Sequence, residues 1–201
     1  HDPKEALMTV LNSDQTLSLN IVELTCQNST SRFAVSCGIG FDAAVCHEIG
    51  ISPIKMFMNR FGLGKLAYLL IGVKQLFALP PVSLSVETDR LTFKQVFLTA
   101  IMNMKYEGGG FQFCPFADPS DHLLDVIVME GMRRPKLILC LFLSLFGKHT
   151  RFKGVHLLHC TKISVHTPKP LAVHKDGEYA GFQTDFSVSL AKENLQLIIP
   201  R

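Results

Sequence analysis

The stretch NMKYEGGGFQFCPFADPSDHLLDVIV, from Asn103 to Val128, is the part of the sequence that decides the fold. It contains three consecutive glycines, Gly108 to Gly110, which would weaken the interior of a helix or strand and so indicate unusual dihedral angles or a close backbone approach. A proline-centred loop follows with Asp118 and Asp121, and an alternating apolar strand is predicted from Leu123 to Met129. A glycine turn beside clustered carboxylates is a suitable place for a cation or for a substrate that carries a phosphoryl group.

The aspartates of this stretch could supply oxygen ligands to a hard cation. Asp118, Asp121 and Asp125 do not have the spacing of the EF-hand calcium loop. We expect Asp125 to lie within the strand, on its polar face. The alternative is a solvated loop in which Asp118-Pro119 starts an Asx turn, and the residues alone leave both interpretations open.

Most of the remaining chain is predicted to form short strands. Several segments alternate between apolar and polar residues, a pattern that favours antiparallel pairing with one face in solvent. These segments are 17–25, 82–88, 162–166, 171–174, 186–190 and 195–199, together with a short apolar run at 32–37 and a long one at 92–104 that should be a central strand.

Three helices are predicted between the strands. Asp42 to Ile49 is short, whereas Gly64 to Ala78 has helical apolar spacing and ends before Pro80-Pro81, which cannot continue a helix. Pro135 to Gly147 begins with proline and ends with glycine, the usual asymmetry of helix ends. The sequence therefore predicts one β-rich α+β unit, with two packed antiparallel sheets and helices on one side.

The composition is that of a folded and rather apolar protein. Of its 201 residues, 47% are hydrophobic and 18% are charged, and the mean hydropathy is +0.24. A net charge of +3 with scattered basic residues gives no reason to expect nucleic acid as a partner. The six cysteines lack CxxC spacing, which predicts buried thiols, and no apolar signal core follows His1, so we expect a cytoplasmic protein.

One apolar segment raises the question of a membrane. LILCLFLSLF, Leu137 to Phe146, has ten residues, about half of what a bilayer span needs. A buried helix is one interpretation. The other is a helix that rests on an anionic membrane surface, because basic residues flank the segment. They are Arg133, Arg134 and Lys136 before it, and Lys148, His149, Arg151 and Lys153 after it.

The segment HKDGE, His174 to Glu178, lies between two predicted strands. Asp-Gly is a strong signal for a hairpin, so a plain turn is one interpretation. The other places Glu178 at a strand edge as a carboxylate base. Elsewhere, Gly38-Ile39-Gly40 lacks the third glycine of a dinucleotide fingerprint, and the sequence contains no GxxxxGK[ST] phosphate loop and no HExxH pattern.

Taken in order, four motifs resemble the soluble diacylglycerol kinase and sphingosine kinase family of lipid kinases. GIGFDAAV (38–45) is similar to the motif at the head of the family's second domain, and GKLAYLLIGVKQL (64–76) is similar to the helix that follows it. NMKYEGGGFQFCPFADPSDHLLDV is similar to the Asn…GGG…P-x-A…D-G-x-L-D-V block, and HKDGEY (174–179) to the late D-G-E motif. The family usually has glycine where this chain has His122.

The resemblance implies the fold of residues 1–201: the β-sandwich that forms the C-terminal domain of a two-domain, bacterial-type kinase with the diacylglycerol/NAD kinase-like fold. The family's N-terminal domain carries a Gly-Gly-Asp-Gly-Thr nucleotide loop, which this sequence does not contain. We therefore expect the co-substrate ATP to be bound mainly by that missing domain, and the isolated chain to be inactive. The oligomeric state stays open, a homodimer included.

The resemblance also implies roles for four residues. Glu178 would be the base that takes the proton from the lipid hydroxyl. Asp121 would organise a Mg²⁺ site, with oxygens from Asp118 and from the backbone of Leu123. The leading hypothesis is an ATP-dependent kinase of diacylglycerol or a related lipid alcohol, in peripheral contact with the inner face of the membrane. The alternative is a non-catalytic lipid-binding or regulatory module of the same fold, and a nicotinamide-nucleotide kinase is a weaker third option.

Overall fold

The computed structural model describes residues 2–27, 29–53, 57, 60, 64–86 and 91–199, with the side chains of 64–69 and 86 left aside. About half of the chain forms strands, and helices form a smaller part. In chain order the elements are α1 (Pro3–Asn12), β1 (Thr16–Cys26), β2 (Ser29–Phe33), β3 (Ser36–Gly40), α2 (Phe41–Ile51), α4 (Gly64–Ala78), β4 (Val82–Val86), β5 (Leu91–Met102), η1 (Gly108–Gly110), β6 (Leu124–Glu130), α5 (Arg134–Ser144), η2 (His149–Arg151), β7 (Val155–Cys160), β8 (Lys162–Lys175) and β9 (Glu178–Ile198).

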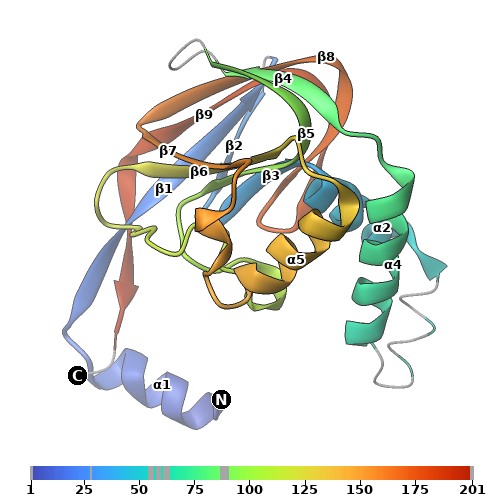
Figure 1. The fold of residues 1–201 in the computed structure, drawn as a ribbon. Helices are drawn as coiled ribbons and strands as arrows, with labels where there is room; N and C mark the ends of the chain where they lie inside the picture. The colour runs from blue at the N-terminus through green and yellow to red at the C-terminus, as the bar shows by residue number, and fades with distance from the viewer. Residues whose placement is uncertain are drawn as a thin grey trace.

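The described strands pair antiparallel throughout and form one hydrogen-bonded network in the order β2-β1-β9-β8-β3-β5-β6-β7. β4 also pairs with both β5 and β8, so that β3 and β4 lie end to end between these two long strands. The two halves of this network form the layers of the β sandwich seen in Figure 1. The β-rich α+β prediction is thereby confirmed, although the two predicted sheets are continuous with each other.

A first hydrophobic core fills the space between the two halves of the network. It is built from inward-facing side chains of β1, β2, β9 and β8 on one side and of β5 and β6 on the other. Period-two alternation places these residues together, since every second side chain of a strand shares a face. Among the most buried members are Val22, Leu24, Cys37, Ile39, Leu84, Ile101, Val126, Val128, Ile163, Val173 and Val188.

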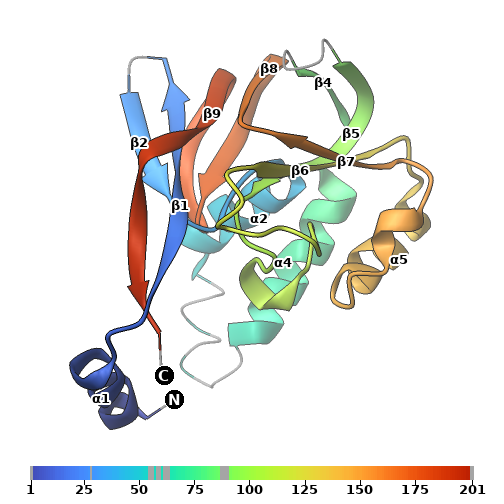
Figure 2. The ribbon, with the colours of Figure 1, turned by 90° about the vertical axis from the view of Figure 1, so that its left-hand side faces the viewer.

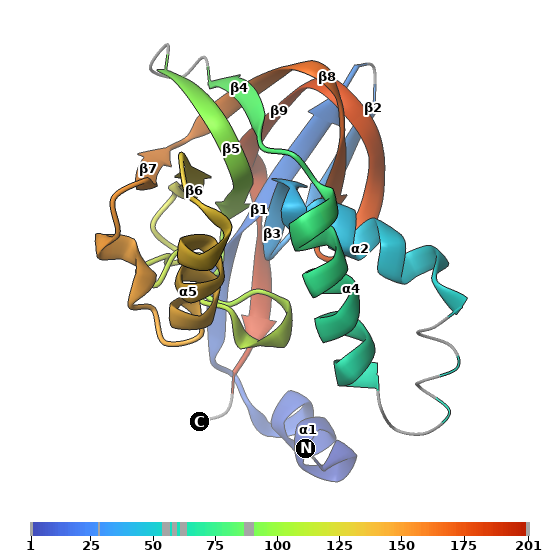
Figure 3. The ribbon, with the colours of Figure 1, turned by 45° about the vertical axis from the view of Figure 1, so that its right-hand side comes forward.

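A second core lies on the opposite face of β5 and β6, where the helices α4 and α5 cover it (Figures 1 and 3). The two strands are therefore buried on both faces, which explains why 92–104 is a long apolar run rather than an alternating one. Its members include Leu76, Phe97, Leu98, Ala100, Met102, Ile127, Met129, Leu137 and Cys140.

The predicted helices are close to those observed. The bounds of α4, Gly64–Ala78, agree with the prediction, whereas α2 and α5 are shifted by one to three residues at their ends. Along the described part of the chain, no helix is both long and apolar enough to cross a membrane. Cys37, Cys114 and Cys140 are buried thiols as predicted, whereas Cys26, Cys46 and Cys160 are only half-buried.

Several elements were not predicted. α1 begins at a capping signal, in which the Asp2 carboxylate accepts the backbone N–H of Lys4 at 2.9 Å, and the helix extends away from the sheets near the end of β9 (Figure 2). β7 was also missed. β8 and β9 are each one long strand where two short ones were expected. In β8, a register shift between His166 and Leu171 accommodates Pro168 and Pro170.

Candidate active site

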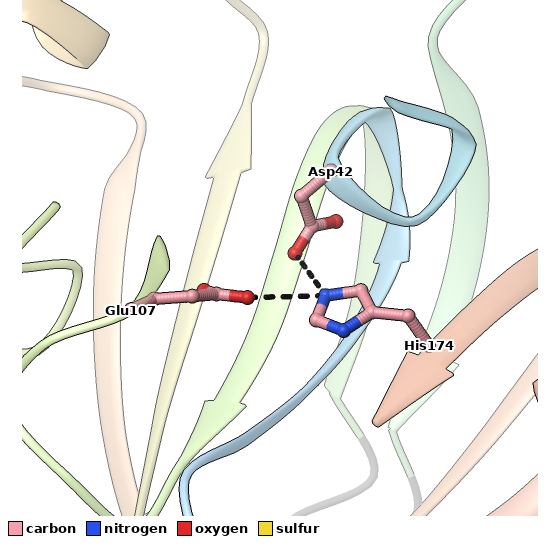
Figure 4. A group of neighbouring side chains, drawn as sticks. All are labelled: Asp42, Glu107 and His174. Carbon is pink, nitrogen blue, oxygen red and sulfur yellow. Dashed lines mark hydrogen bonds and ion pairs between the residues drawn. The ribbon is translucent and has the colours of Figure 1, made fainter. Parts of the chain in front are cut away.

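Three segments that are distant in the sequence meet at one end of the sheet (Figure 4). Asp42 lies in the first turn of α2, directly after β3, and Glu107 lies in the loop after β5. His174 lies near the end of β8, which pairs with β3. None of these residues was predicted as a site residue, and their side chains form a group of three that could hold a metal ion.

The imidazole of His174 joins the two carboxylates. Its Nε2 lies 3.0 Å from Oδ2 of Asp42 and 3.2 Å from Oε1 of Glu107. The His174 side chain is fully buried, and the two acids expose only 11% and 12% of theirs. The backbone N–H of Ala43 donates to Oδ1 of Asp42 at 2.8 Å, and the Ser36 hydroxyl donates to Oε1 of Glu107 at 3.0 Å.

The charges of this cluster depend on one another. Burial by itself would lower the pKa of His174, but the charges and hydrogen bonds of Asp42 and Glu107 outweigh it and raise the pKa to about 10. Burial raises the pKa of Asp42, although the interaction with His174 opposes that shift. The Gly177 N–H approaches Nδ1 at 3.3 Å, a contact that suits a neutral ring. Both carboxylate contacts are made to Nε2 and place a proton on that nitrogen, and with the pKa raised to about 10 we expect an imidazolium at neutral pH.

Gly38 is what lets this cluster form. A Cβ atom at this position would lie 2.0 Å from Oδ2 of Asp42 and 2.3 Å from Nε2 of His174. The first glycine of the GIGFDAAV motif is therefore required for the approach of two polar side chains. The second, Gly40, takes a φ of 91° as the chain turns from β3 into α2.

The HKDGE segment forms a hairpin between β8 and β9. Asp176 and Gly177 both have positive φ, 45° and 80°, as a type I′ turn requires. The Asp176 carboxylate also accepts three backbone N–H groups of the β2–β3 connection at 2.8–3.0 Å, so this residue anchors the hairpin. Glu178 is exposed, opposite Lys175 at the start of β9.

The aspartate loop before β6 has the turn that the sequence predicts. Oδ1 of Asp118 accepts the backbone N–H and the hydroxyl of Ser120 at 2.9 and 2.6 Å, and these hydrogen bonds lower the pKa of Asp118. Oδ1 of Asp121 accepts the N–H of Leu123 at 2.8 Å. His122 has a φ of 60°, the left-handed region that the glycine usual in the family would adopt without strain.

Asp125 is buried in β6 and contacts Nδ1 of His159 at 3.0 Å. It shares the face of β6 that carries Ile127 and Met129, two members of the second core, so the prediction of a polar face was wrong. Burial raises the pKa of Asp125; His159 opposes the shift, and the charges of Asp121 and Asp118 add to it. The three carboxylates thus make one anionic region, the donor chemistry that suits Mg²⁺.

The predicted site residues occupy two places in the structure. Asp118, Asp121 and Leu123 share one loop, where the Asp121 N–H donates to the Asp118 carbonyl at 3.3 Å. Glu178 lies on the hairpin, and among the described residues no hydrogen bond or ion pair joins it to these aspartates. The sequence did hold a signal for the missed cluster, since each of its members lies beside a glycine motif.

Comparison with solved structures shows a fold shared with bacterial diacylglycerol kinases. A putative diacylglycerol kinase from Bacillus anthracis superposes with a TM-score of 0.68 at 18% identity, over 96% of this chain and 61% of that one. Another diacylglycerol kinase structure from the same organism gives a TM-score of 0.62 at 14% identity, over 96% and 57%. At such identities the likeness concerns the fold, which is that of one part of these kinase chains.

The family follows from the sequence. Residues 36–199 match the YegS C-terminal NAD kinase beta sandwich-like domain, and this chain belongs to that family. The putative lipid kinase YtlR of Bacillus subtilis is 29% identical over 162 residues, which cover 80% of this chain and 52% of YtlR. A diacylglycerol kinase of Mycobacterium tuberculosis is 29% identical over 172 residues, 84% of this chain and 52% of that protein. The chain spans about half the length of these relatives.

Proposed function

We propose that this chain is the lipid-binding part, and a contributor to the catalytic centre, of an ATP-dependent kinase that phosphorylates diacylglycerol or a related lipid alcohol. The observation that supports it most is the Asp176-Gly177-Glu178 hairpin. Asp176 fixes the hairpin by three backbone hydrogen bonds, and Glu178 extends from it into solvent. A carboxylate held on a rigid turn, but free to meet a substrate, suits a base.

In the proposed reaction, the oxygen of the lipid hydroxyl attacks the γ-phosphorus of ATP, and the carboxylate of Glu178 accepts the proton of that hydroxyl. The bond from that phosphorus to the bridging oxygen breaks, and ADP leaves. Asp121, Asp118 and the Leu123 carbonyl would hold Mg²⁺, which neutralises charge on the phosphates. ATP would be bound mainly by the part of the relatives that this chain does not span.

A kinase assay tests the proposal. The chain joined to the preceding region of its own gene should convert dispersed diacylglycerol and labelled ATP into phosphatidate, in a Mg²⁺-dependent manner. The 201-residue chain alone should bind lipid and form no phosphatidate. Absence of product from the longer protein, with lipid binding retained, would favour the alternative of a non-catalytic module. Robust phosphatidate formation by the 201-residue chain would refute the proposal that ATP is bound mainly outside this chain.

We further propose that α5 contacts the membrane surface. Leu137, Cys140 and Ser144 are buried against the sheet, whereas the other side of the helix exposes an apolar stripe. The stripe consists of Ile138, Leu139 and Phe142 of α5 and of Phe146 in the turn after it, and the two phenylalanines are 56% and 57% exposed. The segment is therefore not fully buried, and its solvent-facing side is apolar. Exposed apolar side chains near basic residues favour binding to an anionic lipid surface.

The basic flanks differ in what they can do. The Arg134 guanidinium lies 5.6 Å from the ring centroid of Phe77 and 5.5 Å from that of Phe97, and it donates to the Leu76 carbonyl. It therefore ties α5 to α4 and is unsuited to headgroups. The exposed basic residues that remain beside the stripe are Arg133, Lys148, Arg151 and Lys153.

Vesicle sedimentation is expected to show binding to anionic vesicles that weakens as salt rises, because surface charge is screened over about 8 Å at physiological ionic strength. Replacing Phe142 and Phe146 together by serine should weaken vesicle binding about tenfold, since the membrane would no longer bury the two phenyl groups. The matched control replaces Leu195 and Leu197 of β9, which are also exposed, by serine. Equal binding to neutral and anionic vesicles, or equal effects of both double substitutions, would contradict this surface.

A further inference from the structure

The cluster of Asp42, Glu107 and His174 is separate from the aspartate loop and has no role in the mechanism above. It holds two nearly buried carboxylates against a single imidazole. Even with His174 protonated, one negative charge is left over. Oε2 of Glu107 is buried and, among the residues that the structure describes, has no hydrogen-bond partner. Buried charge of this kind is costly unless a proton or a cation compensates it.

The donor atoms have the spacing of ligands around one ion. Nε2 of His174 lies 3.0 and 3.2 Å from the two carboxylate oxygens, and all three atoms lie within 4.8 Å of one another. Two ligands that each lie about 2.1 Å from a metal and subtend a right angle are about 3.0 Å apart. An ion could thus take the place of the proton that the three groups share, with only small shifts.

We propose that Asp42, Glu107 and His174 bind one divalent first-row transition metal ion, such as Mn²⁺ or Zn²⁺. Imidazole nitrogen is a poor partner for Mg²⁺ and a good one for these ions, whereas carboxylate oxygens suit Mn²⁺ as well. The absence of a Cβ at Gly38 leaves room at the donors. Asp42 and Glu107 keep 11% and 12% of their side-chain surface exposed, so the site is not sealed from solvent.

Binding would connect three segments: the start of α2, the glycine loop after β5 and the β8–β9 hairpin. Such an ion would therefore hold in place the hairpin that carries Glu178. The ion itself would not contact a substrate. The proposal does not depend on the lipid kinase activity, because it concerns the metal-binding properties of this chain alone.

Mn²⁺ is the suitable probe, because it prefers oxygen and nitrogen ligands to the six cysteine thiols. Bound ions are counted by the loss of the free Mn²⁺ electron paramagnetic resonance signal. All measurements use an Asp121→Asn background, which removes the expected Mg²⁺ site. The Asp121→Asn protein should bind one Mn²⁺ per chain. Adding Glu107→Gln should weaken this Mn²⁺ binding at least about tenfold. Glu130→Gln is the control, since Glu130 also contacts a histidine, with Oε1 3.0 Å from His156 Nε2.

Thermal melts verify that each variant folds, so that a loss of binding is not a loss of structure. The proposal is wrong if the Asp121→Asn chain binds no Mn²⁺ at millimolar concentration, or if Glu107→Gln binds Mn²⁺ as tightly as the control.

Discussion

If Glu178 is the base of the proposed lipid kinase, replacing it by glutamine is expected to lower turnover by about 10²–10⁴-fold, the usual contribution of a positioned general base. The amide has the size of the carboxylate but cannot accept the proton of the lipid hydroxyl. Because Glu178 is exposed at the first residue of β9 and Asp176 anchors the hairpin, the fold and the lipid affinity should not change.

The measurement is phosphatidate formation against Mg²⁺ concentration, with thermal melts beside it. Glu193→Gln is the matched control, because Glu193 is an exposed glutamate of the same strand that pairs with Arg32 at 2.9 Å. Asp121→Asn should behave differently and raise the Mg²⁺ requirement before turnover is lost. If Glu178→Gln keeps nearly full turnover, the Asp-Gly-Glu segment is only a hairpin turn.

The replacement of His174 by glutamine is expected to lower the free energy of unfolding by about 3–5 kcal/mol, the cost of leaving buried charges without their partner. The pKa of His174 is raised from 6.5 to about 10 on folding, so the folded state binds the proton more tightly. The stabilisation is therefore complete below pH 6.5 and is lost as the pH rises through 10. The difference between the two proteins should shrink over the same range.

Urea unfolding between pH 6 and 10, with a chelator to remove metal ions, measures both effects. His166→Gln is the control, because His166 belongs to the same strand and its Nδ1 lies 2.6 Å from Oδ1 of Asp185, but both side chains are more than half exposed. An exposed pair contributes about 0–1 kcal/mol. A penalty for His174→Gln that is no larger than that control, or that stays constant with pH, would contradict the buried imidazolium.

The sequence by itself determined the features that depend on neighbouring residues. The alternation of residues predicted most of the strands, although β7 was missed, and the apolar spacing before Pro80-Pro81 predicted the bounds of α4, Gly64–Ala78. Asp176-Gly177 identified the hairpin because only a few residue types tolerate positive φ at both turn positions. The Asx turn at Asp118 follows in the same way from a side chain that reaches its own backbone.

Only the tertiary structure decided which polar groups meet. Asp42, Glu107 and His174 are each followed or preceded by a turn that the sequence indicates, but their contact requires that β3 pairs with both β5 and β8. Asp125 was placed correctly in its strand, yet it is buried because its face of β6 carries the second core. Alternation fixes which side chains share a face, whereas the burial of a face and the neighbours across it are set by the packing of distant segments.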